Sequence, residues 1–466
     1  MKEVRNKRTV SNRFHDLVLK LIKMLNVALI TGTFAVVWMG YYAERTWAPY
    51  YAKGNYLIIA LFLILYAIYT DVYDALLISI KRISEMIYSQ ALAAFLTDGI
   101  MYIVCWLLTK HLPAVWPLLL TYMAQIFIGT LWSLFSHKWY FKQFPPKQTA
   151  IIYGMRKGME QLISEYGLDV KFKVERIVSA SECIESEQNV LDHMEAVFLC
   201  GVSSHERNVI LKYCVKHNIS AYVIPRVGDL LMSSAKYMHM FHLPILQVQR
   251  YHPPVEFVLV KRVIDIIVSG VALVIFSPIM LLTAIAIKIY DRGPVFYKQC
   301  RLTKDGKEFY VLKFRSMAVD AEQDGVARLS TGENDSRITP VGKVIRKTRI
   351  DELPQFINIL KGEMSVVGPR PERPEIAREY EKELPEFSLR LQAKAGLTGY
   401  AQVYGKYNTS PYDKLQMDLM YLAKPSLWED LRIMFATVKI LFIPDSTEGI
   451  EEGQIIASLR EDEQEE

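Results

Sequence analysis

The most apolar stretch of the chain, Val263–Ile289, reads VIDIIVSGVALVIFSPIMLLTAIAIKI. It follows two basic residues, Lys261 and Arg262, and it contains Ser277-Pro278 near its middle. Proline removes a backbone donor and clashes with the preceding turn, so this pair predicts a helix break. Because the sequence on both sides is typical of soluble domains, we expect a kinked re-entrant helix that enters and leaves on one membrane face. The alternative, a fifth spanning helix, would separate the two soluble parts.

Four further apolar stretches precede this one, at roughly 21–41, 56–73, 87–108 and 115–135. Each approaches the ~20 residues that a helix needs to cross a bilayer. They predict an N-terminal four-helix transmembrane domain over residues 1–146. Lys and Arg residues lie before the first stretch, between the second and third, and after the fourth, which places those segments in the cytoplasm. A soluble helical bundle is the alternative, although buried soluble helices rarely run apolar on all faces for this length.

Residues 147–250 show a different pattern, in which short apolar runs alternate with amphipathic segments. Expected strands lie at 150–153, 172–178, 196–200 and 221–224, and expected helices at 156–166 and 206–217. This alternation predicts a cytosolic, Rossmann-like βαβ module. The first strand leads into Gly154-Met-Arg-Lys-Gly158, which lacks the full GxGxxG pattern of dinucleotide-binding loops. Nucleotide binding and a packing or regulatory role both remain open for the module.

The composition limits the chemistry that the protein can perform. The chain has 466 residues, 23% of them charged, and a net charge of +5, a mild value that does not argue for nucleic acid. Its five Cys show no CxxC spacing, and no His follows Lys261. A Ser-His-Asp triad, a Cys-His pair and a zinc site are therefore excluded from the C-terminal half. Chemistry in this half must use carboxylates and cations, with or without a hard metal ion.

An acidic pair, Asp351-Glu352, lies where such chemistry could occur. Pro354 fits the first turn of a helix that runs to Leu360, so the two carboxylates would lie at the positive end of that helix, which favours their ionised form. Basic residues surround the pair along the sequence. Arg370 lies in a proline-rich loop and can present a planar guanidinium to phosphate. Two expected strands and the segment before the acidic pair supply the other candidate cations: Arg301, Lys313, Arg315 and Arg337.

Seven motifs follow one another in this half. They are, in order, Lys261-Arg262 with Asp265, Gly293-Pro294-Val295-Phe296, Lys313-Phe314-Arg315-Ser316-Met317, Arg337-Ile338-Thr339, Asp351-Glu352-Leu353-Pro354-Gln355, Gly368-Pro369-Arg370-Pro371 and Gly396-Leu397-Thr398-Gly399. Together they resemble the bacterial sugar transferase family, the monotopic polyprenyl-phosphate phosphoglycosyl transferases. The resemblance covers Lys261 to about Ile443, and the preceding helices and βαβ module are similar to the large-form members. Thr303 and Ile350 depart from the family pattern at positions where Gly and Leu are usual.

The resemblance implies a reaction. Members of the family move a sugar 1-phosphate from a UDP-sugar to polyprenyl phosphate, release UMP, and form a covalent intermediate on the Asp of the acidic pair. Asp351 would be this nucleophile, with Glu352 as a metal ligand or acid–base partner, and Mg²⁺ would be held by both carboxylates. The candidate cations named above would bind the substrate phosphates. The implied enzyme is a hexose-1-phosphate transferase of the bacterial inner membrane with its catalytic domain on the cytosolic face.

The expected fold is thus a membrane protein with three parts and a tail. A four-helix transmembrane bundle (1–146) and an α/β Rossmann-like module (147–250) precede a C-terminal α/β catalytic domain (251–447) that contains the re-entrant helix 263–289, and an acidic tail (448–466) ends the chain. Helices expected at 412–423 and 428–442 would lie on the membrane surface or pack as ordinary amphipathic helices.

Two other functions remain open. One is a membrane-anchored, nucleotide-binding sensor or scaffold without catalysis, against which the presence of both Asp351 and Glu352 argues. The other is a processive glycosyltransferase, which would need a DxD metal motif that the C-terminal half lacks. We expect UDP-glucose or UDP-galactose as donor, the lipid bilayer as partner and no nucleic acid. The sequence leaves homodimer formation open.

Overall fold

The protein is described by a computed structural model. It covers residues 2–49, 53–154, 156–186, 189–318, 337–405 and 409–440, with side chains from residue 16 onwards. The predicted acidic tail, 448–466, lies outside the described residues.

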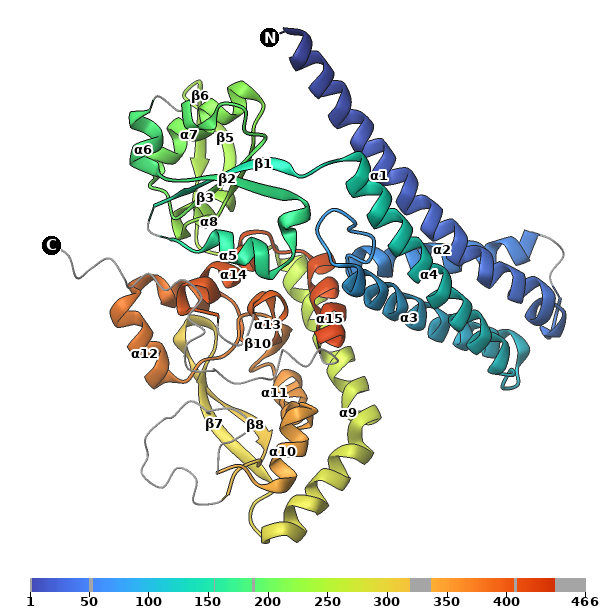
Figure 1. The fold of residues 1–466 in the computed structure, drawn as a ribbon. Coiled ribbons are helices and arrows are strands. Elements are labelled where there is room, and N and C mark those ends of the chain that lie inside the picture. Colours follow the sequence, from blue (N-terminus) through green and yellow to red (C-terminus); the bar gives the residue numbers. More distant parts are fainter. Residues whose placement is uncertain are drawn as a thin grey trace.

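Among the described residues, five helices are long and apolar enough to cross a membrane. Four of them come first and pack side by side, so the prediction of several apolar helices at the N-terminus is confirmed (Figure 1). The fifth lies at the start of the C-terminal half. Their bounds are α1 (Lys2–Val37), α2 (Lys53–Val72), α3 (Ile83–Thr109), α4 (Trp116–Gln143) and α9 (Val255–Asp291).

A polar network lies inside the apolar bundle α1–α4. Asn26 on α1 donates to Gln90 on α3 at 3.0 Å and accepts from Tyr66 on α2 at 3.1 Å. Gln90 in turn donates to Ser133 on α4 at 2.9 Å. Because polar groups in a dry interior need partners, this network fixes how the four helices face each other.

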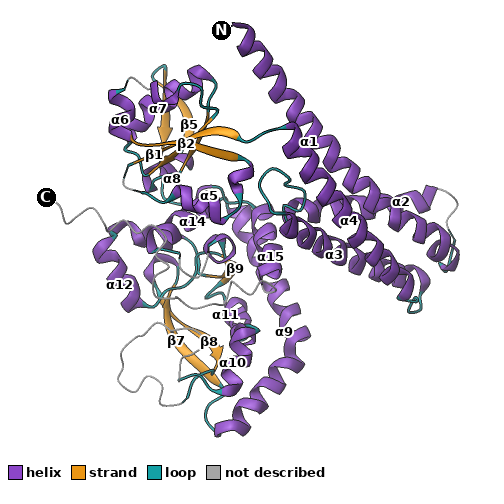
Figure 2. Cartoon of the chain, in the orientation of Figure 1, coloured by secondary structure: helices purple, strands orange, loops and turns teal. Residues whose placement is uncertain are grey.

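Residues after the bundle form a four-stranded parallel sheet in the order β2-β1-β3-β4. Each strand falls on one of the four apolar runs that the sequence indicates. Parallel strands need crossover connections, and here these are helices that pack against the sheet (Figures 1 and 2). The elements of this module are β1 (Lys147–Tyr153), α5 (Met159–Glu165), β2 (Phe172–Ser179), α6 (Ala180–Glu185), β3 (Ala196–Cys200), α7 (Ser204–His217), β4 (Ser220–Val223) and α8 (Val227–Ser233).

An antiparallel hairpin follows, formed by β5 (Lys236–Met240) and β6 (Leu243–Gln247). Its aromatic residues face away from the protein: Tyr237 is 83% exposed and Phe241 is 80% exposed.

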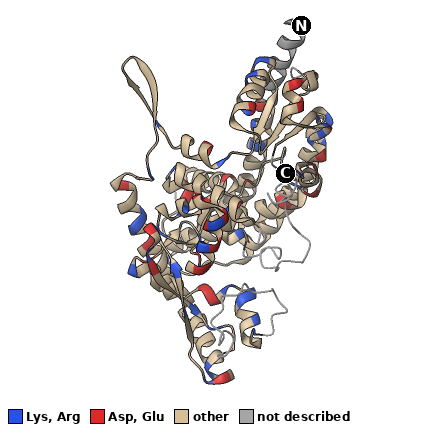
Figure 3. Ribbon diagram, turned by 90° about the vertical axis from the view of Figure 1, so that its left-hand side faces the viewer, with Lys and Arg blue, Asp and Glu red and all other residues tan. Residues whose placement is uncertain are grey.

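The C-terminal half is an α/β unit built around α9. It contains an antiparallel hairpin, a short parallel pair of strands and several helices (Figure 2). Charged residues of both signs lie along its ribbon (Figure 3). The elements after α9 are β7 (Phe296–Leu302), β8 (Glu308–Phe314), α10 (Pro340–Lys347), α11 (Gln355–Lys361), β9 (Ser365–Val367), α12 (Pro374–Glu383), β10 (Gly396–Thr398), α13 (Tyr400–Tyr404), α14 (Pro411–Ala423) and α15 (Leu427–Ile440).

The expected interruption of the helix at Ser277-Pro278 is wrong, whereas the expected kink agrees with the bent course of this helix (Figure 1). The helix α9 begins at Val255, eight residues before the predicted start, and continues through Pro278 to Asp291. Pro278 cannot donate to the carbonyl of Val274 four residues earlier, but the hydroxyl of Ser277 donates to this same carbonyl at 2.8 Å. The orphaned acceptor is thus satisfied and the helix continues, with a curved course (Figure 1).

The helix α15 connects the α/β unit to the bundle. Arg432 contacts Asp74, in the loop between α2 and α3, at 2.6 Å, and Lys439 donates to Ser89 on α3 at 2.7 Å. The ring of Phe435 packs edge-on against Tyr69. These contacts fix the α/β unit at one end of the bundle.

The polar network gives a test of the bundle. A Cβ at Gly129 on α4 would lie 2.8 Å from Oε1 of Gln90, so Gly129→Val should displace the amide and cost about 1–3 kcal/mol. The matched control is Gly99→Val, because a Cβ at Gly99 meets nothing within 4 Å. We expect a lower thermal midpoint in detergent for the first variant alone. Equal midpoints would show that the network does not stabilise the bundle.

Candidate active site

The acidic pair lies in a single 3₁₀ turn, Ile350–Glu352, between α10 and α11. Pro354 directly precedes α11, which begins at Gln355. Proline lacks the backbone donor that a helix start leaves unused, which explains why the turn ends here and the helix follows. Both acidic residues are partly buried.

Two cations converge on the carboxylate of Glu352. Lys313, on β8, approaches its Oε1 at 3.2 Å, and Nη2 of Arg370 approaches the same oxygen at 3.5 Å. The side chains of Lys313 and Glu352 are 21% and 18% exposed, whereas Arg370 is 43% exposed. Arg370 is therefore the more accessible of the two cations to a ligand in solvent.

These charges affect the two carboxyl groups in opposite directions. Burial, and then the charge of Glu352, raise the pKa of Asp351 well above its ordinary 3.8. Burial also disfavours a charge on Glu352, but Lys313 and Arg370 outweigh it and hold the pKa of Glu352 well below 4.5. Adjacent carboxylates with separated pKa values are a common feature of catalytic sites.

The loop that carries Arg370 is held by close backbone packing. The amide of Gly368 donates to the carbonyl of Thr398 at 2.9 Å, and that of Gly396 donates to Pro369 at 2.9 Å. A side chain at Gly368 would collide with the carbonyl of Lys394, so only glycine fits there. The two short strands β9 and β10 thus fix the start of the loop.

The helix α9 anchors the same region from the other side. Asp265 accepts from the amide of Val366 on β9 at 2.9 Å and from the hydroxyl of Ser365 at 3.1 Å. Arg262 donates to the carbonyls of Ile359 and Leu360, at 2.6 and 2.7 Å, at the end of α11. Lone carbonyls at a helix C-terminus favour such a cation. The apolar helix therefore positions both the strand before Arg370 and the helix after the acidic pair.

The remaining predicted cations make contacts of other kinds. Arg301 donates to the carbonyl of Pro371 at 3.0 Å and lies 3.8 Å from Glu372, and burial lowers its pKa to about 10. Arg315 is buried and pairs with Asp291 at the end of α9. The carbonyl of Arg337 accepts from Ala318 at 2.9 Å. The structure thus brings Lys313 and Arg370 to the pair, while Arg301 supports the Arg370 loop.

One buried pair behind this loop could not be predicted from the sequence. Arg390 is 1% exposed, and its guanidinium contacts Asp418 on α14 at 2.6 Å and donates to the carbonyl of Arg370 at 2.9 Å. Another contact that the sequence did not indicate is that of Asn358 on α11, which accepts from Leu312 on β8 at 2.9 Å and donates to Tyr310 at 2.8 Å. These residues lie far from their partners in the sequence and belong to none of the motifs, so only the folded chain reveals them.

The acidic pair supplies the carboxylates that could bind a metal ion at this site. Among the described residues, no three or more His, Cys, Asp or Glu side chains cluster as metal ligands. Mg²⁺ commonly binds through one or two carboxylates and completes its shell with substrate phosphates and water. Asp351 and Glu352 fit this donor set, with the phosphates supplying the other oxygens.

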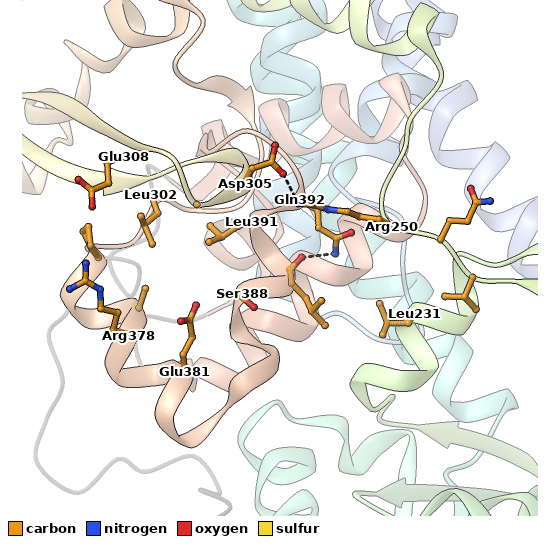
Figure 4. Close-up of a pocket in the computed structure, with 16 residues that line it drawn as sticks. Leu231, Arg250, Leu302, Asp305, Glu308, Arg378, Glu381, Ser388, Leu391 and Gln392 are labelled. Carbon is orange, nitrogen blue, oxygen red and sulfur yellow. Dashed lines mark hydrogen bonds and ion pairs between the residues drawn. The ribbon is translucent and has the colours of Figure 1, made fainter.

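A separate pocket of about 920 Å³ is lined by residues of the module and of the α/β unit (Figure 4). Leu231 of α8, Leu302 of β7 and Glu381 of α12 are among the residues that line it, and Arg250 contacts Asp305 at its edge at 2.5 Å. None of the predicted site residues lines this pocket. The pocket and the candidate site around the acidic pair are therefore lined by different residues.

The part of the chain that contains this site is similar to known proteins. The family model described as bacterial sugar transferase matches residues 256–444. A UDP-N-acetylgalactosamine-undecaprenyl-phosphate N-acetylgalactosaminephosphotransferase of Aeromonas hydrophila is 38% identical over 50% of this chain and 54% of its own. UDP-glucose:undecaprenyl-phosphate glucose-1-phosphate transferases of Klebsiella pneumoniae and Caulobacter vibrioides are 44% and 39% identical, over 40% and 42% of this chain.

The extent of these matches differs between the relatives. The chain spans 54% of the Aeromonas protein and 41% of the Klebsiella protein, about half of each, but 74% of the Caulobacter protein. The residues matched by the family model, 256–444, comprise the C-terminal α/β unit and α9.

The contact between Asp265 and β9 gives a test of how the site is held. Asp265→Asn keeps the oxygen that accepts from Val366 and Ser365, whereas Asp265→Leu leaves a buried amide without its acceptor. An unsatisfied buried donor costs about 1–3 kcal/mol. We expect the Leu variant to lower the thermal midpoint in detergent and the Asn variant to stay close to wild type. Equal losses in the two variants would contradict this role of the acceptor oxygen.

Proposed function

The chain belongs to the bacterial sugar transferase family, and we propose that it transfers a sugar 1-phosphate from a UDP-sugar to undecaprenyl phosphate and releases UMP. The observation that supports this proposal is the Asp351–Glu352 pair, with Lys313 at 3.2 Å and Arg370 at 3.5 Å from Glu352. Two carboxylates beside two cations suit a reaction in which an anionic nucleophile meets a diphosphate. The relatives named above act on UDP-sugars and undecaprenyl phosphate, which agrees with this assignment.

The proposed reaction has two steps. The carboxylate of Asp351 attacks the phosphorus that carries the sugar, and the bond from this phosphorus to the bridging oxygen breaks, so that UMP leaves with the bonding electrons. An oxygen of undecaprenyl phosphate then attacks the same phosphorus and displaces the Asp351 carboxylate. A carboxylate needs no deprotonation for this role once it is ionised, as in other aspartyl-phosphate enzymes.

The cations reduce the repulsion between the anions. Lys313 and Arg370 would neutralise phosphoryl oxygens, and Arg301 would hold the loop of Arg370 through its bond to Pro371. When bound at Asp351 and Glu352, Mg²⁺ would supply further positive charge to the diphosphate. Phosphoryl transfer depends mostly on such positioning and charge stabilisation.

We further propose that α9 is re-entrant and that the α/β unit lies at the cytosolic face of the bacterial inner membrane. Both ends of α9 contact this unit: Arg262 binds the end of α11, and Asp291 binds Arg315 next to β8. A spanning helix would separate its ends by the ~30 Å hydrocarbon core of the bilayer. The apolar residues in its middle, such as Val274 and Leu282, are exposed for contact with lipid. The site would then lie close to a lipid-borne phosphate.

The covalent step is tested without lipid. Wild-type protein incubated with Mg²⁺ and UDP-glucose or UDP-galactose should release UMP in a burst and retain sugar phosphate on Asp351. Asp351→Asn should abolish both, because an amide is a poor nucleophile and a weaker Mg²⁺ ligand than a carboxylate. UMP release and mass spectrometry of the Asp351 peptide measure the two results.

A mechanism without an intermediate predicts the reverse pattern, in which UMP appears only after undecaprenyl phosphate is added. Lipid-dependent first release, with no labelled peptide, would falsify the covalent proposal. Release of UDP in place of UMP would contradict the reaction class. Mass spectrometry of the lipid product identifies the sugar.

The role of Arg370 has its own test. Arg370→Lys keeps the charge but loses the planar fork that binds phosphate at two points, so turnover should fall about 10- to 100-fold. Arg378→Lys, at an exposed position on α12, is the matched control and should keep wild-type turnover. Unchanged turnover of Arg370→Lys would exclude Arg370 from phosphate binding.

A further inference from the structure

The parallel sheet of the module presents its carboxyl edge to the C-terminal unit. In doubly wound sheets this edge is the usual place for ligands, because the loops that follow the strands gather there. Here α14, a helix of the α/β unit, lies next to this edge (Figure 1). Leu230 of the module belongs to the same buried apolar cluster as Leu415 and Leu419 of α14.

Two polar contacts join the edge to this helix. Arg156, in the loop after β1, donates to both carboxylate oxygens of Asp413, at 2.8 and 3.2 Å. These two side chains are 18% and 15% exposed, so the ion pair is largely shielded from water. Gln416 of α14 also donates to the carbonyl of Pro225, which follows β4. Both contacts come from loops at the carboxyl ends of strands.

The same helix contacts the loop of the candidate active site. Asp418 of α14 pairs with Arg390 at 2.6 Å, and these side chains are 1% and 2% exposed. Arg390 donates to the carbonyl of Arg370 at 2.9 Å and lies 3.6 Å from Glu372, while Lys414 lies 4.0 Å from Glu372. Both Arg390 and Lys414 therefore contact the loop that presents Arg370 to Glu352.

We propose that Arg156 is a positioning residue for the loop that carries Arg370. Its ion pair with Asp413 holds α14 in place. In turn, α14 holds the backbone at Arg370, because Asp418 binds Arg390 and Arg390 binds the carbonyl of Arg370. A bidentate guanidinium–carboxylate pair fixes orientation as well as distance, and a helix of 13 residues is a rigid connection. This inference rests on the proposed function, because Arg370 matters through its contact with the donor phosphates.

The first experiment measures the UMP burst without lipid, as a function of UDP-sugar concentration. Arg156→Ala and Asp413→Ala should each raise the half-saturating donor concentration roughly 3- to 30-fold, the effect typical of substitutions along a coupling path. The burst amplitude, which counts competent sites, should stay the same. The charge-swapped double variant, Arg156→Asp with Asp413→Arg, should restore the wild-type value. Lys173→Ala, in an exposed ion pair on β2, is the matched control.

A lower burst amplitude with an unchanged half-saturating concentration would overturn the proposal, since it would mean that Arg156 only stabilises the fold. Wild-type values in both single variants would overturn it as well. Absence of any burst from the wild-type protein would instead count against the proposed function.

Hydrogen exchange tests the connection independently of catalysis. In the full-length protein in detergent, the backbone amide hydrogens of residues 368–374, prolines excepted, should exchange faster in Arg156→Ala than in wild type. The charge swap should reverse this change. Exchange unchanged in this loop would refute the coupling, whatever the protein's activity.

Discussion

The contact of α9 with one α/β unit at both of its ends is the constraint on which the architecture depends. The helix is the most apolar segment of the chain, yet Arg262 near its start and Asp291 at its end are bound by α11 and by Arg315. In the re-entrant arrangement that we propose, an apolar middle between two polar attachments brings the unit to the boundary of lipid and water. The position of Ser277 beside Pro278 allows this helix to curve without leaving a carbonyl unpaired.

The cost of burying charge explains why the charged residues of the candidate site are linked in a series of contacts. A buried charge is costly unless it is paired, so each charged group near Glu352 needs a partner that is itself held in place. Arg370 reaches Glu352 from a loop, the loop is bound by Arg390, and Arg390 is bound by Asp418. The most exposed member of this series, Arg370, is also the one best placed to exchange its partner for a phosphate oxygen.

The sequence predicted the parts of the fold that have a periodic or compositional pattern. The apolar helices follow from the thickness of a bilayer, the four strands of the module from short apolar runs, and the acidic pair with Arg370 from motifs of chemically suitable residues. The break at Pro278 was predicted wrongly, because the rule for proline considers the lost donor and not a neighbouring hydroxyl that replaces it. Contacts such as Arg156 with Asp413 could not be predicted, since they join residues 257 positions apart and leave no pattern in either segment.

The module and the candidate active site are joined by contacts between side chains of the module and side chains of the α/β unit. The loop at 154–158 lacks the full glycine pattern of a dinucleotide-binding loop, and its Arg156 binds a carboxylate of the protein itself. An arginine at the carboxyl edge of a parallel sheet suits an anion, and here Asp413 provides that anion. The geometry that binds ligands in other doubly wound sheets thus binds a helix here. In our proposal, such a sheet affects the chemistry through the helix, because α14 holds Arg390 at the backbone of Arg370.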